Sequence, residues 1–147
     1  MQDGERKGAA LPKQIAVVPL FDPAVEADGY YLSSLYVELF WLPRLGPTSF
    51  ALARNLERKL HVWPDGYELD CALTAIQLGV GHHQGGRSPF SSALGRLAAN
   101  GFVEWRDEAT LAVRRRVRRL PGRLAEQLPE ALAVAHRRVL TGDLILN

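Results

Sequence analysis

The sequence predicts a mainly α-helical domain with a small β-hairpin, and three observations lead to this fold class. Between residues 33 and 100, apolar residues recur at three- and four-residue spacings in four stretches, as they do on one face of a helix. Residues 102–106 and 111–120 instead alternate apolar and polar side chains on either side of a short turn, as paired strands do. The composition, 47% hydrophobic and 23% charged over 147 residues, is that of an ordinary globular domain.

The N-terminal part shows little helical periodicity. Residues 1–13 indicate a flexible arm, and residues 14–21 (QIAVVPLF) indicate a short strand. Pro19 has no N–H to donate to a neighbouring strand, so this strand is expected at the edge of a sheet. Residues 22–29 are expected to form a loop.

The first two helices are expected before residue 63. One covers residues 33–42, with Ser33 or Ser34 as its N-cap and Pro43 limiting its end. The next follows Pro47, because apolar residues recur from Phe50 to Leu60 while charged residues take the other side.

Two more helices follow. The third runs from about residue 68 to 78 and ends at Gly79, the residue type that most easily adopts a left-handed C-cap. The fourth begins at Ser88 as N-cap, with a proline next to it, and ends at residues 100–101. Beyond residue 120, one or two final helices are broken at Pro129. In the third helix, the residues expected to face inward are Leu69, Leu73 and Ile76.

Charge is unevenly distributed, although the net charge is only +2. Residues 1–80 contain 7 Lys or Arg and 10 Asp or Glu, whereas residues 81–147 contain 11 and 6. All eleven cations of the second part are Arg, and five of them lie within residues 114–119. Because guanidinium groups pair well with phosphates and guanine edges, this cluster is either a footprint for a polyanion or a solvated surface strand. The alternation places Arg114, Arg116 and Arg118 on one face of the strand.

The order of helix, helix, connecting loop, helix and hairpin resembles the winged helix-turn-helix superfamily. Residues 69–120 carry this resemblance, and residues 88–103 (SPFSSALGRLAANGFV) are similar to its recognition helix and first wing strand. The connection at residues 80–87 is longer and richer in Gly than the usual short turn. The resemblance implies a fold that is mainly α with a small β-hairpin wing, with extra N- and C-terminal helices. It divides the chain into an arm and short strand (1–32), a winged helix-turn-helix domain (33–120) and C-terminal helices for packing or dimerisation (121–147).

The resemblance also implies that helix 88–100 lies in the major groove of double-stranded DNA, with the Arg-rich hairpin on the backbone. Independently, a helix that begins at Ser88 presents N–H groups to a phosphate, and small outward side chains let the helix approach the base edges. We expect base reading by Ser91, Ser92 and Arg96. We expect phosphate contacts by Arg87, Ser88, Arg106, Arg114, Arg116 and Arg118.

Motifs for catalysis are weak. Residues 81–88 (GHHQGGRS) match a phosphate-loop pattern apart from Arg87 in place of Lys, but a helix rather than a strand precedes them. This Gly-rich loop is still able to hold a DNA phosphate. Adjacent His82 and His83 lack the spacing of metal ligands, and Cys71 lies among apolar residues as a small core residue would. We therefore expect no enzyme activity, no metal and no cofactor.

Together these features predict a cytoplasmic protein that binds double-stranded DNA with full or partial sequence specificity, as a transcriptional regulator would. The last helices carry an apolar stripe that either packs on the first helix or forms a homodimer. The alternative is a module that binds protein or RNA without DNA sequence specificity. A single Cys indicates a reducing compartment, and no apolar run approaches the roughly 20 residues of a membrane span.

Overall fold

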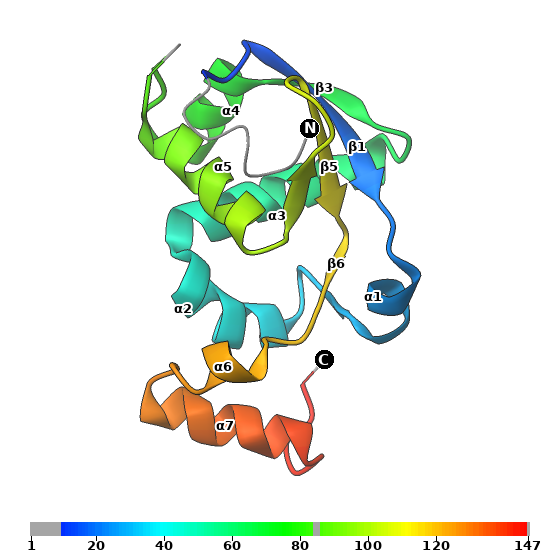
Figure 1. Cartoon of the computed structure of the whole chain (residues 1–147), viewed down its shortest axis with the longest axis vertical. Coiled ribbons are helices and arrows are strands. Elements are labelled where there is room, and N and C mark those ends of the chain that lie inside the picture. Colours follow the sequence, from blue (N-terminus) through cyan, green and yellow to red (C-terminus); the bar gives the residue numbers. More distant parts are fainter. Residues whose placement is uncertain (1–9, 84–85, 147) are drawn as a thin grey trace.

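A four-stranded mixed sheet lies in the upper part of the computed structural model of the chain (Figure 1). Its strands are β1 (Gln14–Leu20), β3 (Tyr67–Asp70), β4 (Val103–Trp105) and β5 (Thr110–Arg114), in the order β3-β1-β5-β4. β1 is antiparallel to β3 and parallel to β5, and β4 is antiparallel to β5. The structure describes residues 10–83 and 86–146, so most of the expected N-terminal arm (1–9) and part of the Gly-rich loop (84–85) lie outside the described residues.

The expected fold class, mainly α with a small hairpin wing, was wrong, because the chain is α/β with a mixed sheet that includes a parallel pair. The expected hairpin is present as β4 and β5, but β1 joins β5 on its other side and brings β3 with it. β1 is therefore an interior strand and not the predicted edge strand.

Pro19 is compatible with this interior position for a local reason. The Ala16 N–H donates toward β5, so the nitrogens of odd-numbered residues in β1 point toward β3. Pairing with β3 ends at Val17, whereas pairing with β5 continues to Leu20. The N–H that Pro19 lacks would thus point beyond the end of β3, where no ladder partner is needed.

Among the described residues, ten further elements complete the fold. A short helix α1 (Pro23–Asp28) leads to β2 (Tyr30–Tyr31), which pairs with β6 (Arg116–Val117) in a separate two-stranded sheet. The helices between β2 and β4 are a π-helix η2 (Val37–Trp41), α2 (Leu42–Leu45), α3 (Pro47–Val62), α4 (Cys71–Leu78) and α5 (Pro89–Ala99). The last two are α6 (Gly122–Ala125) and α7 (Glu130–Leu140), separated at Pro129 as expected.

The first predicted helix continues past Pro43 and ends instead at Gly46, which has a φ of 82°. The π-helix explains why: the Leu42 N–H donates to the Val37 carbonyl five residues earlier. A wider turn of this kind inserts one residue into a helix, and here it directly precedes a proline that has no N–H of its own.

The third predicted helix starts later than expected. Residues 67–70 pair with β1 as a strand, and Asp70 caps α4 by accepting a hydrogen bond from the Leu73 N–H. The buried face of α4 consists of Cys71, Thr74 and Ala75. Leu73 and Ile76, predicted to face inward, are 53% and 75% exposed. The end of this helix at Gly79, with a left-handed φ of 72°, confirms the prediction.

The predicted strand at residues 111–120 is broken at Arg115. β5 ends at Arg114 in the large sheet, and β6 begins at Arg116 in the small one. Arg114, Arg116 and Arg118 therefore do not share the face of one strand, and this prediction was wrong.

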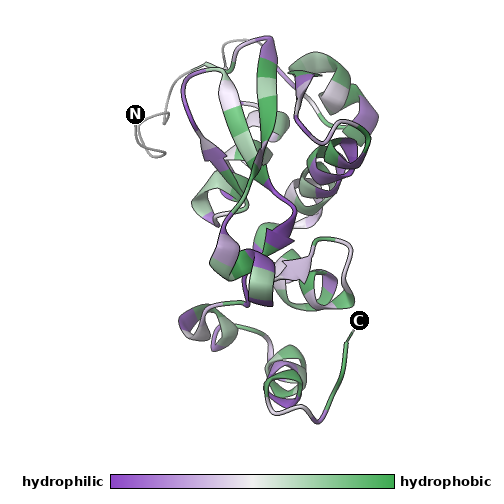
Figure 2. Cartoon of the chain, turned by 90° about the vertical axis from the view of Figure 1, so that its right-hand side faces the viewer, coloured by the Kyte–Doolittle hydropathy of each residue, from purple (hydrophilic) through white to green (hydrophobic). Residues whose placement is uncertain are grey.

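The core joins the sheet to the helices. α3 packs against β5 and α5, and α5 packs against β4. Figure 2 shows apolar residues along the central strands, with the C-terminal helices set below them. There α7 packs on η2, and its buried residues are Ala133 and His136. Among the described residues, no helix is both long and apolar enough to cross a membrane.

Candidate nucleic-acid interface

The start of α5 is held by a reciprocal cap. Ser88 is buried, and its hydroxyl accepts a hydrogen bond from the Ser91 N–H at 3.2 Å. In return, the Ser91 hydroxyl accepts one from the Ser88 N–H at 2.9 Å. The cap confirms the predicted helix start. Because both hydroxyls are used within the chain, Ser88 and Ser91 have less capacity for the DNA contacts expected of them.

The solvent-facing side of α5 carries small side chains. Ser92, Gly95, Arg96 and Ala99 are exposed, at spacings that place them on one face of the helix. Apart from the neighbouring residues and the backbone of α5 itself, a Cβ built at Gly95 would have no heavy atom within 4 Å. Another molecule can therefore approach the α5 backbone closely along this face. Arg96 is the one long hydrogen-bond donor on the face.

Arg96 borders a pocket of about 210 Å³ between α5 and the start of α3. One of its terminal nitrogens donates to the Leu45 carbonyl at 3.1 Å, just before the Gly46 turn. Thr48 and Ser92 also line the pocket. The pocket thus brings together two hydroxyl groups, the Arg96 guanidinium and the first turn of α3, a 16-residue helix without a side-chain cap. This combination favours the binding of a negatively charged group.

Arg44 joins this neighbourhood from α2. Its Nε donates to the Asn100 Oδ1 at 3.5 Å, directly after α5, and a terminal nitrogen donates to the Gln127 Oε1 at 3.4 Å, after α6. Both acceptors are neutral amides. The guanidinium therefore keeps its full charge at the surface between the end of α5 and α6.

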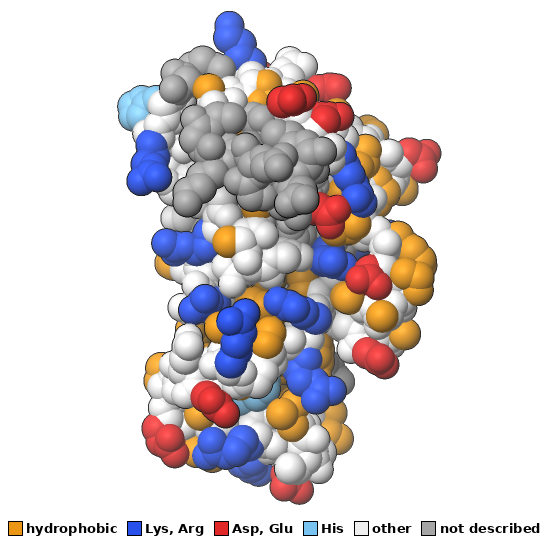
Figure 3. Space-filling model, viewed as in Figure 1, with side chains coloured by type: hydrophobic (Ala, Val, Ile, Leu, Met, Phe, Trp, Pro, Cys, Tyr) orange, Lys and Arg blue, Asp and Glu red, His pale blue; other side chains and the backbone are white. Residues whose placement is uncertain are grey.

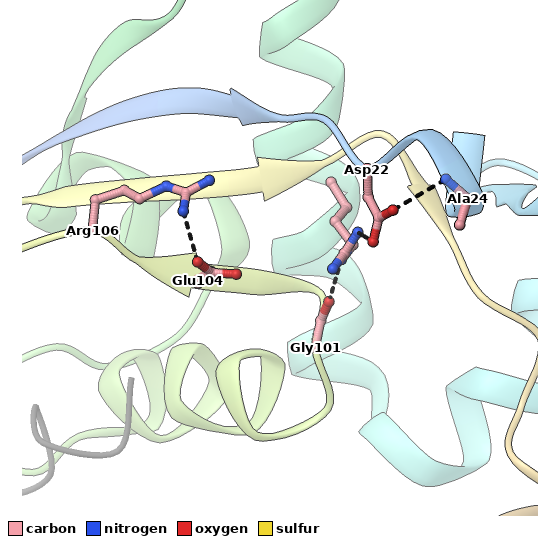
Figure 4. Close-up of polar contacts among 6 residues, drawn as sticks. Asp22, Ala24, Gly101, Glu104 and Arg106 are labelled. Carbon is pink, nitrogen blue, oxygen red and sulfur yellow. Dashed lines mark hydrogen bonds and ion pairs between the residues drawn. The ribbon is translucent and has the colours of Figure 1, made fainter. Parts of the chain in front are cut away.

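The hairpin arginines are less available than predicted. Arg106 pairs with Glu104 at 2.7 Å (Figure 4). The adjacent turn carries exposed Asp107 and Glu108. Arg114 lies at the other end of β5, where its Nε donates to the Gly101 carbonyl at 2.8 Å. The hairpin tip is thus acidic, and its arginines are paired within the chain.

Further contacts hold the arginines that follow β5. Arg114 also lies 3.6 Å from the carboxylate of Asp22, which caps α1. Arg116 donates to the Glu26 carbonyl at 3.1 Å and lies over the ring of Tyr31, 4.0 Å from its centroid. These two arginines join α1 and β2 to the end of the sheet, which gives them a structural role.

Arg115 points toward α3 instead. A terminal nitrogen donates to the His61 Nδ1 at 3.3 Å, and the His61 Nε2 donates to the Glu57 carboxylate at 2.6 Å. Glu57 is buried, so this chain of hydrogen bonds links its charge to a guanidinium. Three of the five clustered arginines are therefore held by the fold.

A second set of arginines remains exposed, and none of them forms an ion pair with a carboxylate of the described residues. Figure 3 shows Lys and Arg side chains gathered across the middle of one face, where Figure 1 places α2, β6 and the start of α6. We call six of these exposed arginines the unpaired arginines: Arg44, Arg87, Arg96, Arg118, Arg119 and Arg123. Arg58 on α3 and Arg138 on α7 are exposed without such an ion pair as well, but they lie outside this set and serve as controls below.

Sequence reasoning found only part of this set. Arg87, Arg96 and Arg118 were predicted, whereas Arg44, Arg119 and Arg123 were not. The position of Arg119 within the arginine cluster was a usable signal. Arg44 carried no such signal, because only the packing of α2 brings it near the end of α5. Arg123 carried none either, since it lies outside the arginine cluster in the sequence.

Comparisons with protein-family models, with curated proteins and with solved structures found no match to this chain. The class of protein is therefore described by its structural features alone. It is an α/β domain in which an exposed helix with small side chains lies beside unpaired arginines. The winged helix-turn-helix resemblance stays a prediction about the local order of elements at residues 69–120.

Proposed function

We propose that this chain binds double-stranded DNA, with the exposed face of α5 against the base edges and the unpaired arginines on the phosphates. The observation that carries the proposal is the combination of these arginines with the small side chains of α5. Arg44 reaches the residue after α5, and Arg96 lies on α5 itself, so charge and helix face adjoin.

Charge distribution supports a polyanionic partner more than net charge does. A total of +2 is small, but acidic residues are concentrated elsewhere in the chain. Guanidinium groups that lack nearby carboxylates keep their attraction for phosphate, and each phosphate contact releases counterions from DNA. The expected binding is therefore strongly salt-dependent.

The DNA contact that we assign to each residue follows from how freely its polar atoms can reach DNA. Ser92 and Arg96 are the polar α5 residues on the exposed face, and they take the base-reading role. Arg96 donates one hydrogen bond to the Leu45 carbonyl and has further N–H groups to offer a base. Phosphate contacts fall to the other unpaired arginines. Arg106, Arg114 and Arg116 would have to leave partners in the chain first, so they contribute less than their place in the cluster suggested.

Binding in this mode fits a transcriptional regulator if it is selective for sequence. A specific site is typically bound 10³-fold or more tightly than random DNA. Selection from a random duplex library, followed by affinity measurements on selected and scrambled sites, decides this point. Arg96→Lys keeps a cationic donor but loses the fork that pairs with guanine, and we expect it to reduce the preference more than the affinity for random DNA.

A second candidate function is a protein-binding module, and α4 favours it. Leu73 and Ile76 are exposed on one face of this helix, and a partner protein or a second copy of the chain would remove them from water. The mass of the purified protein in solution, measured by light scattering after size exclusion, tests for a homodimer. Leu73→Ser with Ile76→Ser should return a dimer to a monomer.

The DNA proposal is tested by fluorescence anisotropy of a labelled duplex over a salt series. We compare wild type with the double variant Arg44→Ala and Arg118→Ala. We expect weaker binding to all sequences, and a slope of log Kd against log salt that is lower by about 0.9 for each lost phosphate contact. The matched control, Arg58→Ala with Arg138→Ala, removes the same charge from exposed positions on α3 and α7.

Two outcomes would overturn the proposal. One is no binding of any duplex at about 50 mM salt, where phosphate contacts are strongest. The other is an equal loss in the test and control pairs, which would mean that only total charge matters. Equal or tighter binding of RNA in competition would favour the alternative of an RNA-binding module.

A further inference from the structure

His136 is the buried polar residue through which α7 contacts the rest of the fold. It is 2% exposed, and the other buried residue of α7 is Ala133. The His136 Nε2 lies 2.8 Å from the hydroxyl oxygen of Tyr36, just before η2. The Leu120 N–H donates to the same hydroxyl oxygen at 2.9 Å.

This arrangement fixes the direction of the hydrogen bond. A tyrosine hydroxyl has one proton, and burial raises the pKa of Tyr36 to about 12, so that proton stays on the oxygen. Since the oxygen already accepts from Leu120, the proton is available for the His136 Nε2. Only a neutral imidazole with an unprotonated Nε2 can accept it.

A protonated His136 would not fit this site. Its Nε2–H would face the hydroxyl oxygen, and the tyrosine proton would lose its acceptor in a buried position. The surroundings are aromatic: the ring of Phe40 lies 4.8 Å from that of His136, edge to face, and Tyr30 is stacked on Tyr36 at 3.8 Å. Among the described residues, His136 forms no ion pair that would compensate the charge.

The charged groups around this site do not favour protonation either. Arg119, in the segment before α6, repels a second positive charge at His136. On α7 itself, Arg137 pairs with Glu130 at 3.8 Å on the exposed side, and Glu38 on η2 is also exposed. Burial, and then Arg119, lower the pKa of His136 below its usual value of 6.5.

We propose that α7 is a pH-dependent latch, docked on η2 while His136 is neutral and released when this side chain takes up a proton. Release would uncover the aromatic side chains of Tyr36 and Phe40. The latch goes beyond DNA binding and does not depend on it, because it rests on contacts between α7, η2 and the segment before α6.

The pH range follows from the sign of the shift. Well above pH 6.5, His136 is neutral in both the docked and the released state, so docking has its full strength. As the pH falls below 6.5, the released helix binds a proton that the docked helix excludes. The docking equilibrium then weakens by up to about tenfold for each pH unit, until the lower pKa of the docked state is reached.

Hydrogen exchange of the full chain, read by mass spectrometry, tests the latch between pH 7.5 and 5.0, with each rate corrected for intrinsic exchange. Peptides from α7 should lose protection below pH 6.5, while peptides from α3 keep theirs. His136→Gln offers a carbonyl oxygen to the Tyr36 hydroxyl but does not titrate, so its α7 protection should not change with pH. The proposal fails if wild type and variant follow the same pH profile.

A second measurement covers the case in which His136→Gln does not dock α7 even at pH 7.5. In wild type, NMR follows the His136 ring and the α7 amide signals through a pH titration. The latch requires one common midpoint below 6.5. Separate midpoints, or α7 amides that do not shift while the ring titrates, would overturn it.

Discussion

Replacing Gly95 by alanine should make the protein more stable and its binding of DNA weaker. Gly95 lies in the middle of α5, where glycine costs about 1 kcal/mol relative to alanine because of its backbone freedom. The added Cβ would have no heavy atom within 4 Å, so no packing conflict offsets this gain. We expect the free energy of unfolding to rise by about 0.5–1 kcal/mol.

The same methyl group should interfere with DNA at the α5 face. If the helix backbone approaches the base edges at Gly95, a Cβ there would force the duplex away, and overpacking of this kind typically costs 1–3 kcal/mol. A cost of about 1 kcal/mol corresponds to about a fivefold rise in Kd. The stabilised variant should therefore bind a duplex at least about fivefold more weakly than wild type.

Urea denaturation and duplex anisotropy measure the two effects on one preparation. Gly79→Ala is the matched control, because it adds the same methyl in open space but at a φ of 72°, where alanine is strained by about 1 kcal/mol. It should lose stability and keep its affinity for DNA. Lower stability of Gly95→Ala would refute the assignment of its surroundings, and unchanged DNA affinity would refute the docking of α5.

Three further substitutions test how the fold is held. Gly66→Ala would place a Cβ 2.5 Å from the Val17 carbonyl oxygen at a φ of 128°, and we expect a loss of at least about 2 kcal/mol in urea denaturation; a loss below 1 kcal/mol would contradict this close approach. Ser88→Ala removes the cap of α5 and should cost about 1 kcal/mol, which a two-state urea transition resolves, and an unchanged midpoint would mean that the cap contributes nothing. Tyr36→Phe leaves the buried Leu120 N–H without its acceptor and should cost about 1–3 kcal/mol in thermal or urea unfolding, whereas a neutral result would show that water or another group replaces the hydroxyl.

Local signals in the sequence predicted local structure well. The serine before a proline at the start of α5, the glycine at the end of α4 and the alternation in β4 and β5 each depend on residues within one or two turns of the chain. Such signals do not reveal pairing between distant segments. The parallel pairing of β1 with β5 joins residues more than 90 positions apart, and it changed the fold class.

The pairing of β3 with β1 also explains why the buried face of α4 was predicted incorrectly. Because residues 67–70 are drawn into the sheet by β1, α4 begins at Cys71 with a cap at Asp70. The apolar residues Leu73 and Ile76 match a helical pattern that starts earlier, and they face solvent in the helix that forms. The pattern was present in the sequence, but it did not define which side would be buried.

The candidate site was predictable in kind and only partly in its members. An arginine-rich second half and a helix with small outward residues were visible in the sequence. Which arginines remain free was not, because Arg114 and Arg116 find their partners at residues 22–31, and Arg44 reaches the end of α5 from another helix. Availability of a charge is a property of the folded chain.

The interior position of β1 has a consequence for synthesis on the ribosome. β1 is made early, but its parallel partner β5 follows about 90 residues later, which is roughly 5–20 s at typical elongation rates. During that interval Ile15 and Val17, both buried in the finished protein, have β3 as a neighbour but lack β5. We expect released chains truncated before β5 to be cleaved readily by protease within β1, and released chains that extend past residue 120 to be protected there. Newly made chains of this protein should therefore depend on chaperones until β5 has been made.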